Sequence, residues 1–357
     1  MINKSFKIVT VLCLLLIPLR GFHAEGQSRL QYSENIQGIE HSGNWKPAHF
    51  YQYQVKPANE QSVFRFIRNN QGIELFENGK PVYFYQREPK SADGKYICNN
   101  YLHPLFSIDG DTLTDEFPED HPYHRGIYWA WHQIYIGDHS VGDGWVMENL
   151  TEDVTVVHSG IAGELAILNL DVNWRSALFE GGRSFIREHS TIVVHPLRSG
   201  IRIIDFEINL KALAPGISIG GSDDEKGYGG FCIRMKLPHD LVFTSSNGEV
   251  KPQNTQIKAG TWMDFSGSFN KEKVSGITII SQPDTLNYPV HWILRRETAM
   301  QNIVYPGRQR VKLLENKPIV LKYRVIVHQG DVRKANINRL QGEYIKYSYP
   351  NSGPQIK

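Results

Sequence analysis

The feature that most constrains the fold of this chain is an alternation of apolar and polar residues with a period of two. In Ile201–Leu210 the even-numbered positions from Ile204 onward are apolar, and the odd-numbered positions between them are polar. Ile319–Val327 repeats this alternation, and Leu165–Trp174 and Phe185–Val194 show weaker versions of it. Because successive side chains of a β-strand point to opposite faces, the pattern predicts strands with one buried face.

Turn signals extend this prediction to the whole chain. Asn-Gly pairs at 78–79 and 247–248 lie between extended runs, and this dipeptide is the strongest short-range hairpin signal. No convincing helical stripe follows the N-terminus, and the closest approaches are Leu294–Ile303 and Val332–Leu340. We therefore expect an all-β protein, a large antiparallel two-sheet β-sandwich.

The N-terminus has the features of a secretory signal peptide. Lys4 and Lys7 precede the apolar run Ile8–Leu19, which is shorter than the roughly 20 residues of a membrane span. We expect cleavage near Ala24, a periplasmic or secreted protein, and a single domain over residues 25–357.

The mature chain is expected to be nearly neutral and soluble. Residues 1–24 hold three of the 39 basic residues and none of the 37 acidic ones, which leaves 36 basic residues and a formal charge of −1. This balance argues against a nucleic-acid surface or a polybasic membrane anchor, and no later apolar run is long enough to span a membrane. Cys98 and Cys232 remain, either as one disulfide or as two buried thiols, and cannot by themselves make a structural zinc site.

The densest group of chemically active residues lies in Tyr101–His132, here called the histidine-rich segment. It holds four of the chain's 14 histidines together with acids, an arginine and tryptophans; the candidates are His103, Asp120, His121, His124, Arg125, Trp129, Trp131 and His132. Buried polar groups need partners and buried charges cost several kcal/mol, so a core strand has little use for this mixture. Polar groups beside flat aromatic rings suit a sugar. The alternative is a structural network of satisfied His and Asp side chains.

A metal site in this segment is a weaker interpretation. His121 and His124 are three residues apart and could ligate a metal together with His103 or His132. No helix is predicted here, and Pro122 favours an extended turn that does not hold the two imidazoles on one face. We expect no metal and no other cofactor.

Further candidates are scattered along the chain. Glu188 lies on a predicted strand. It is a candidate general acid or base, and the alternative is a surface ion pair with neighbouring arginines. Tyr228 lies in the glycine-rich turn KGYGGF, and Arg234 lies on the next strand. We expect the two to line a pocket; the alternative is a tight turn in which the tyrosine only packs. Asp264 lies between aromatic residues in WMDFSG, a site or a plain strand end. His291 and Arg295 form another polar and aromatic group around Trp292.

Motifs of the common enzyme classes are missing. The sequence contains no Gly-x-Ser-x-Gly elbow, His-Glu-x-x-His, dinucleotide-binding glycine fingerprint or EF-hand loop. The corresponding hydrolase, zinc-protease and dinucleotide-enzyme interpretations therefore lose support.

Five segments together resemble the bacterial PmoA-like family, which carries the label "methane oxygenase PmoA". They are YLHPLFSIDGDTLTDEFPEDHPYHRGIYWAWH (101–132), KGYGGFCIRM (226–235), WMDFSG (262–267), YPVHWILRR (288–296) and IVLKYRVIVHQG (319–330). The resemblance implies an exported protein of carbohydrate metabolism with a large β-sandwich similar to the galactose-mutarotase type. A methane monooxygenase subunit spans the membrane many times, so the label is not expected to describe the function.

This sequence departs from the family pattern at three positions. Tyr123, Gln282 and Ile293 stand where the resemblance leads us to expect histidines, which weakens a metal interpretation. The positions that keep the pattern are Asp120, His121, His124, Arg125, Tyr228, Asp264 and Arg295.

Our leading hypothesis is an exported enzyme, a hydrolase, lyase or mutarotase-like epimerase, that acts on a glycan or modified sugar. His121 or His124 would act as acid or base, and Arg125 would stabilise developing negative charge. The second proton carrier, or the group that orients a histidine, would be Asp120, Glu188 or Asp264. The substrate-binding candidates are His103, Trp129, Trp131, His132, Tyr228, Arg234, His291 and Arg295, with Trp129 and Trp131 stacked on the sugar ring.

Two alternatives remain open. A non-catalytic glycan-binding or scaffold protein of the same fold would keep the aromatic residues and Arg125 without needing an acid–base pair. A metal-dependent oxidase would hold stoichiometric copper, iron or zinc.

Overall fold

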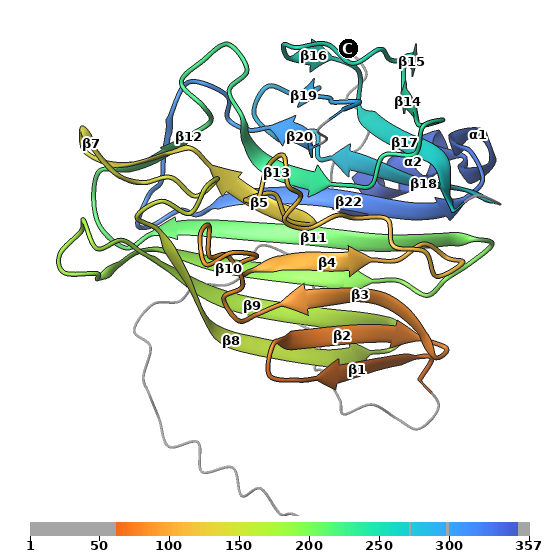
Figure 1. Ribbon diagram of the computed structural model, residues 1–357, viewed down its shortest axis with the longest axis horizontal. Helices are drawn as coiled ribbons and strands as arrows, with labels where there is room; N and C mark the ends of the chain where they lie inside the picture. Colours follow the sequence, from red (N-terminus) through yellow and green to blue (C-terminus); the bar gives the residue numbers. More distant parts are fainter. Residues whose placement is uncertain (1–61, 271–272, 298–299, 349–357) are drawn as a thin grey trace, which may run out of the picture. The chain divides into compact units, whose positions relative to one another are not determined.

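The structure is a computed structural model that describes residues 62–348 apart from 271–272 and 298–299 (Figure 1). The described residues all belong to one compact unit, Tyr53–Lys357. The expected signal peptide, residues 1–24, lies outside them. No helix in the described part of the chain is long and apolar enough to cross a membrane.

One large sheet, here called the first sheet, carries the histidine-rich segment. Its nine strands are all paired antiparallel. In spatial order they are β1 (Phe64–Arg68), β2 (Gly72–Glu77), β3 (Lys80–Gln86), β4 (Tyr101–Leu105), β5 (Ile127–Trp131), β13 (Gly229–Arg234), β20 (Met300–Val304), β19 (His291–Ile293) and β16 (Ile257–Lys258).

The second sheet also has nine antiparallel strands and contains the strands with the clearest alternation. Their order is β15 (Gly248–Glu249), β14 (Val242–Ser245), β17 (Trp262–Asn270), β18 (Lys273–Ser281), β22 (Ile319–Gln329), β11 (Ile201–Ala212), β10 (Ser184–Val194), β9 (Leu165–Arg175) and β8 (Thr151–Ala162). The four strands predicted from the period of two are β9, β10, β11 and β22, so these predictions are confirmed.

A smaller antiparallel sheet of four strands is built from connections between the large sheets. It consists of β21 (Val311–Lys312), β12 (Ile217–Gly220), β6 (Gln133–Ile136) and β7 (His139–Gly142).

The two large sheets pack face to face around one apolar core. Phe231 of β13 stacks on Tyr323 of β22 with ring centroids 4.5 Å apart, and it meets Phe206 of β11 edge to face at 5.2 Å. Trp129 of β5 also contacts the Phe206 ring. These contacts join strands of different sheets, so the predicted all-β sandwich is confirmed.

The predicted hairpin turns are confirmed. Asn78 and Gly79 join β2 to β3 with φ angles of 50° and 77°, and two successive positive φ angles are what a tight two-residue turn requires. Gly248 has a φ of 110° where β14 turns into β15.

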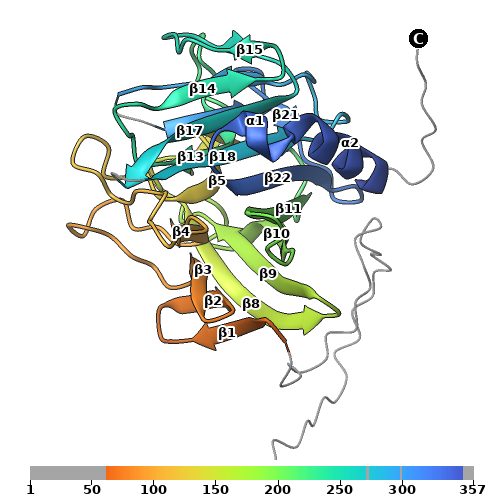
Figure 2. The same cartoon turned by 90° about the vertical axis from the view of Figure 1, so that its right-hand side faces the viewer.

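Part of the outer face of the second sheet, over β11, β17, β18 and β22, is covered by helices, which the sequence pattern indicated only weakly. Of the two stripes noted above, Val332–Leu340 forms α1 (Val332–Ala335) and the start of α2 (Ile337–Ser348), whereas the end of Leu294–Ile303 belongs to β20. Figures 1 and 2 show both helices beside β18 and β22. The polar face of β11 is therefore buried as well: Asp205 is bonded to Arg324, over which the Tyr344 ring of α2 lies.

Candidate active site

The candidate site lies on the outer face of the first sheet and begins with β5. Alternate residues of this strand belong to different clusters: Trp129 and Trp131 pack in the core between the sheets, whereas Tyr128 and Ala130 pack outside with Trp145. His132 lies two residues after Ala130, so its side chain points to the same outer face. The expectation that Trp129 and Trp131 stack on a sugar is wrong, because both point into the core and are at most 2% exposed.

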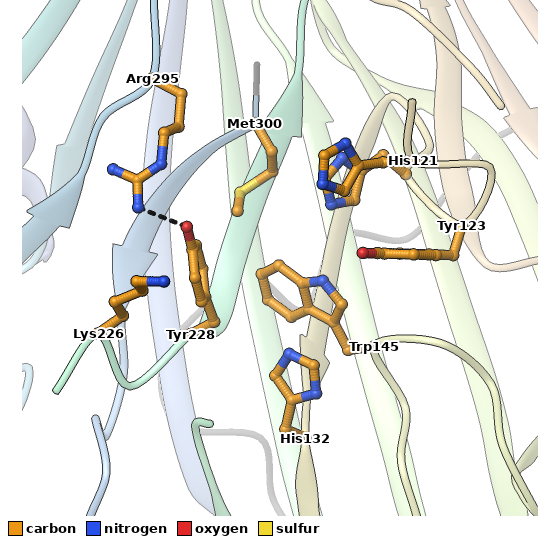
Figure 3. Close-up of a pocket in the computed structure, with 9 residues that line it drawn as sticks. His121, Tyr123, His132, Trp145, Lys226, Tyr228, Arg295 and Met300 are labelled. Atoms are coloured by element: carbon orange, nitrogen blue, oxygen red, sulfur yellow. Dashed lines mark hydrogen bonds between the residues drawn. The ribbon is translucent and has the colours of Figure 1, made fainter. Parts of the chain in front are cut away.

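A cavity of about 260 Å³ opens on this outer face. Its lining, here called the pocket, consists of His121, Tyr123, His124, His132, Trp145, Lys226, Tyr228, Arg295 and Met300. These residues come from the loop before β5, the end of β5, the loop after β7, the loop before β13, the loop after β19 and the start of β20. In Figure 3 Lys226, Tyr228 and Arg295 lie on one side, and His121 and Tyr123 lie on the other.

His121 is held by a carboxylate that is itself held by an arginine. Its Nδ1 lies 2.9 Å from Oδ2 of Asp120, and Nη2 of Arg234 donates to Oδ1 of the same carboxylate at 2.9 Å. Partial burial would raise the pKa of Asp120, but hydrogen bonds from His121 and Arg234 outweigh this effect and hold the pKa at about 2. An ionised Asp120 accepts the Nδ1 proton, so neutral His121 carries its lone pair on Nε2.

His124 lies against His121 and carries its proton on the other ring nitrogen. The two rings are stacked, with centroids 4.7 Å apart and planes inclined by 1°. Burial, and then the nearby His121 and Arg234, lower the pKa of His124 to about 2, so this imidazole stays neutral. Because Nη1 of Arg234 faces its Nδ1 at 3.4 Å, Nδ1 is the acceptor and the proton is on Nε2. His124 is thus a neutral hydrogen-bond donor beside a basic His121.

A second Asp–His pair lies across Trp145 from the first. Nδ1 of His132 is 2.8 Å from Oδ2 of Asp143, whose Oδ1 accepts from the backbone N–H of Trp145 at 2.8 Å. The Trp145 ring stacks on His132 at 5.0 Å and meets His124 edge to face at 6.2 Å. Asp143 therefore positions both the second histidine and the tryptophan that separates the two histidine groups.

The opposite side of the pocket is cationic. Nη2 of Arg295 donates to the Tyr228 hydroxyl at 2.6 Å, and the other Arg295 contacts are backbone carbonyls. Tyr228 contacts the Trp145 ring at 5.5 Å. Lys226 lies two residues before Tyr228 and completes this side (Figure 3). None of the nine lining residues is an aspartate or glutamate.

Arg125 does not line the pocket, which corrects its expected contact with substrate. It is 1% exposed, and Nη1 donates to the carbonyls of Tyr123 and Trp145 at 3.1 and 3.4 Å. Its guanidinium lies 4.5 Å from the centre of the Tyr128 ring. Arg125 thus holds the backbones of two pocket residues from behind.

Glu188 and Asp264, both proposed as proton carriers, lie outside the pocket and are fully buried. Glu188 shares the core-facing side of β10 with Ile186 and is bonded to Asn100 and Trp174, and burial raises its pKa. Asp264 lies on the outer face of the second sheet and is bonded to Thr278 and His328. Both expectations are wrong because each carboxylate is enclosed by other strands.

Three substrate-binding candidates also lie outside the lining. His103 is half-buried with Nδ1 bonded to Thr114, and burial lowers its pKa. His291 lies on β19, where burial likewise lowers its pKa. Arg234 is buried behind the two stacked histidines. The structure therefore brings together His121, His124, His132, Tyr228 and Arg295 of the predicted set.

Four lining residues were not among the predicted site residues: Tyr123, Trp145, Lys226 and Met300. Trp145 had a recognisable signal, since a large aromatic residue stands in the polar, glycine-containing run GDGW. Lys226 stands two residues before the candidate Tyr228. Nothing in the local sequence distinguishes Met300.

Cys98 and Cys232 do not form a disulfide. Both are free and buried, which is the second of the two alternatives given for them above. Within residues 62–348, apart from the two short gaps, no group of three or more His, Cys, Asp or Glu side chains is arranged to hold a metal ion.

Comparison with known families assigns most of the described chain to one family. The family described as "family of unknown function (DUF6807)" matches residues 73–341, which include every pocket residue. No curated protein matches the chain.

Proposed function

Because the chain belongs to the DUF6807 family, whose function is unknown, we propose a function from the pocket itself: a carbohydrate-active enzyme that uses histidine acid–base chemistry. The observation that carries this proposal is the presence of two Asp–His pairs, one on each side of Trp145, in a single pocket. An imidazole titrates near neutral pH, and a carboxylate on Nδ1 fixes which nitrogen accepts the substrate proton.

The lining favours proton abstraction over hydrolysis by two carboxylates. Glycosidases of the common type place two acids on either side of the scissile bond. Here no carboxylate lines the pocket, and Asp120 and Asp143 are both bonded to histidines behind it. The arrangement suits removal of a proton from a sugar carbon next to a carbonyl or carboxyl group, which is the first step of a lyase or an epimerase.

The roles follow from the hydrogen bonds. Nε2 of His121 takes the proton from carbon, and Nε2–H of His124 donates to the oxygen on which negative charge develops. In an elimination, the C–H electron pair forms the carbon–carbon double bond and the adjacent C–O bond breaks. The leaving oxygen then takes a proton from Nε2 of His132, which enters this step as the imidazolium with a proton on each nitrogen and leaves it neutral. In an epimerisation, His132 returns a proton to the opposite face of the same carbon.

The cavity and its aromatic residues indicate how a sugar binds. A volume of about 260 Å³ lies just below the roughly 300–1,000 Å³ of drug-sized ligand pockets, so it suits one sugar ring. Trp145 lines the pocket between the two histidine groups, but it is only 3% exposed and His132 stacks on it. The half-buried rings of Tyr123 and Tyr228 also line the pocket, and the Tyr123 hydroxyl points toward it in Figure 3. These two tyrosines are therefore better placed than Trp129, Trp131 or Trp145 to contact a sugar ring.

Hydrogen–deuterium exchange tests the proposal directly. Keto-sugars and sugar acids are incubated with the protein in D₂O, and NMR follows the C–H next to the carbonyl or carboxyl group. We expect catalysed exchange that falls about 10²–10⁴-fold in His121→Ala and in His132→Ala, as for loss of a general acid or base. The matched control is His139→Ala, which removes an exposed histidine of β7 outside the pocket and is expected to retain the activity.

A glycan-binding protein is the second candidate, favoured by the aromatic lining of Tyr123, Trp145 and Tyr228. It predicts that sugars bind to the pocket, that no C–H exchange is catalysed with any sugar in the panel, and that His121→Ala still binds. This combination of results would rule out the enzymatic proposal.

A further inference from the structure

Neither cation on this side of the pocket, Lys226 or Arg295, forms an ion pair with an acid in the described part of the chain. The exposed Asp224, two residues before Lys226, attracts it only at longer range, and the charge of Lys226 contributes to lowering the pKa of Asp224. Lys226 is half-buried and makes no ion pair or side-chain hydrogen bond among the described residues. The Arg295 guanidinium donates only to neutral groups: the carbonyls of Gln253, Leu294 and Asn254 and the hydroxyl of Tyr228. A partly desolvated cation without a counter-charge is unfavourable, and an anionic ligand would relieve it.

Two further acids near the pocket are bonded to other groups. Asp120 is bonded to Arg234 and His121, and Asp143 is bonded to His132 and to backbone N–H groups on the other side of Trp145. Behind the pocket, the buried Arg125 forms no ion pair with a carboxylate of the described residues. The buried Glu152 attracts Arg125 at longer range, but burial raises the pKa of the Glu152 carboxyl to about 8, so its negative charge is small at neutral pH. The charge of the pocket is therefore unbalanced toward the positive.

The Tyr228 hydroxyl has a proton that it can donate to a ligand. A tyrosine hydroxyl has one proton and two acceptor positions, and Nη2 of Arg295 occupies one acceptor position at 2.6 Å. No acceptor for the hydroxyl proton lies among the described side chains and backbone groups. A charged donor on its oxygen makes Tyr228 a stronger donor to a ligand oxygen.

We propose that the ligand of this pocket is a sugar acid whose carboxylate lies between the Lys226 ammonium and the Tyr228 hydroxyl. This inference rests on the pocket of the proposed function and narrows its substrate class from sugars with a carbonyl or carboxyl group to sugars with a carboxylate. In a hexuronate, the carbon that bears the carboxylate also bears the proton to be removed. With such a substrate, Lys226 and Tyr228 would take the role given above to His124 and stabilise the negative charge that develops on the carboxylate oxygens.

Calorimetric titration with matched sugars tests the carboxylate site. The probes are galacturonate against galactose and glucuronate against glucose, which differ in the carboxylate at C6. We expect at least one uronate to bind about tenfold or more tightly than its neutral partner, since a charge-assisted hydrogen bond is being compared with a neutral one. Equal affinity within both pairs, or no measurable uronate binding, would overturn the proposal.

Variants locate the carboxylate. Lys226→Met removes the charged nitrogen and keeps an unbranched side chain that is one atom shorter. We expect it to weaken uronate binding about tenfold and to leave the neutral sugars unaffected. Lys226→Arg is expected to retain the preference. The control is Lys312→Met, an exposed lysine of β21 outside the pocket, with no expected effect. Equal weakening of uronate and neutral sugar in Lys226→Met, with an unchanged melting curve, would also contradict the proposal.

The exchange assay separates the two proposals. Selective uronate binding without any catalysed C–H exchange would support the carboxylate site and contradict the proposed enzymatic function. Catalysed exchange in a neutral keto-sugar, with no uronate preference in binding, would leave the enzyme standing and remove the carboxylate site.

Discussion

The Asp120–His121 pair and the Asp264–His328 pair have nearly the same geometry in different surroundings. Their N–O distances are 2.9 and 2.8 Å. The His121 and Asp120 side chains are 33% and 31% exposed, whereas those of His328 and Asp264 are both 0% exposed. The first pair lies in a loop at the pocket, and the second joins β17 to β22 across the intervening β18 of the second sheet.

The partners of the two carboxylates explain their different roles. Asp264 accepts from Ser266 on β17, Thr278 on β18 and His328 on β22, so its bonds hold three strands together. Asp120 accepts from His121 and from Arg234 of β13 and leaves the outer edge of the imidazole to the pocket. An Asp–His pair is therefore a candidate for chemistry only where a ligand can reach the ring.

The largest expected effect is on the buried pair. Asp264→Ala leaves His328 and two hydroxyl groups without their acceptor, and we expect the free energy of unfolding to fall by about 3–5 kcal/mol. Urea unfolding followed by circular dichroism measures it. Asp223→Ala, which removes an exposed partner of Arg308, should cost less than about 1 kcal/mol. A wild-type unfolding midpoint in Asp264→Ala would show that this network does not stabilise the sheet.

The pocket pair should respond in the opposite way. His121→Ala is expected to lower the rate of C–H exchange by about 10²-fold or more while changing the free energy of unfolding by less than about 1 kcal/mol. His328→Ala should lower stability far more than His121→Ala. If His121→Ala destabilises the protein as strongly as His328→Ala, both pairs are structural and the comparison fails.

The smallest effect is the dependence of stability on pH through Asp120. Its pKa is about 2 in the folded protein and 3.8 ordinarily, so its charge stabilises the fold above about pH 4 and this contribution is lost as the pH falls toward 2. Allowing for its exposure, we expect Asp120→Asn to cost about 1 kcal/mol at pH 6. The difference from the wild type should disappear near pH 2, as acid titration of both proteins can measure. A difference that persists at pH 2 would mean that the charge of Asp120 is not its cause.

The face of β5 that points toward the core could not be predicted from the sequence. The histidine-rich segment was recognisable because it combines four imidazoles with aromatic residues. The same sequence predicts Trp129 and Trp131 as binding residues, whereas in the structure these two face the core and His132 faces outward. A shift of one residue along a strand moves a side chain to the other face, and local sequence does not say which face of β5 meets the second sheet.

The period of two and the Asn-Gly turns determined on their own that this chain folds into antiparallel strands with one apolar core, because these patterns act through neighbouring residues. Only the tertiary structure decided which residues form the pocket. Trp145, Lys226, Arg295 and Met300 are brought to His121 by the adjacency of β5, β13 and β20, and that adjacency depends on pairing between strands far apart in the chain. Long-range pairing is selected by burial of the whole core, so no local pattern encodes it.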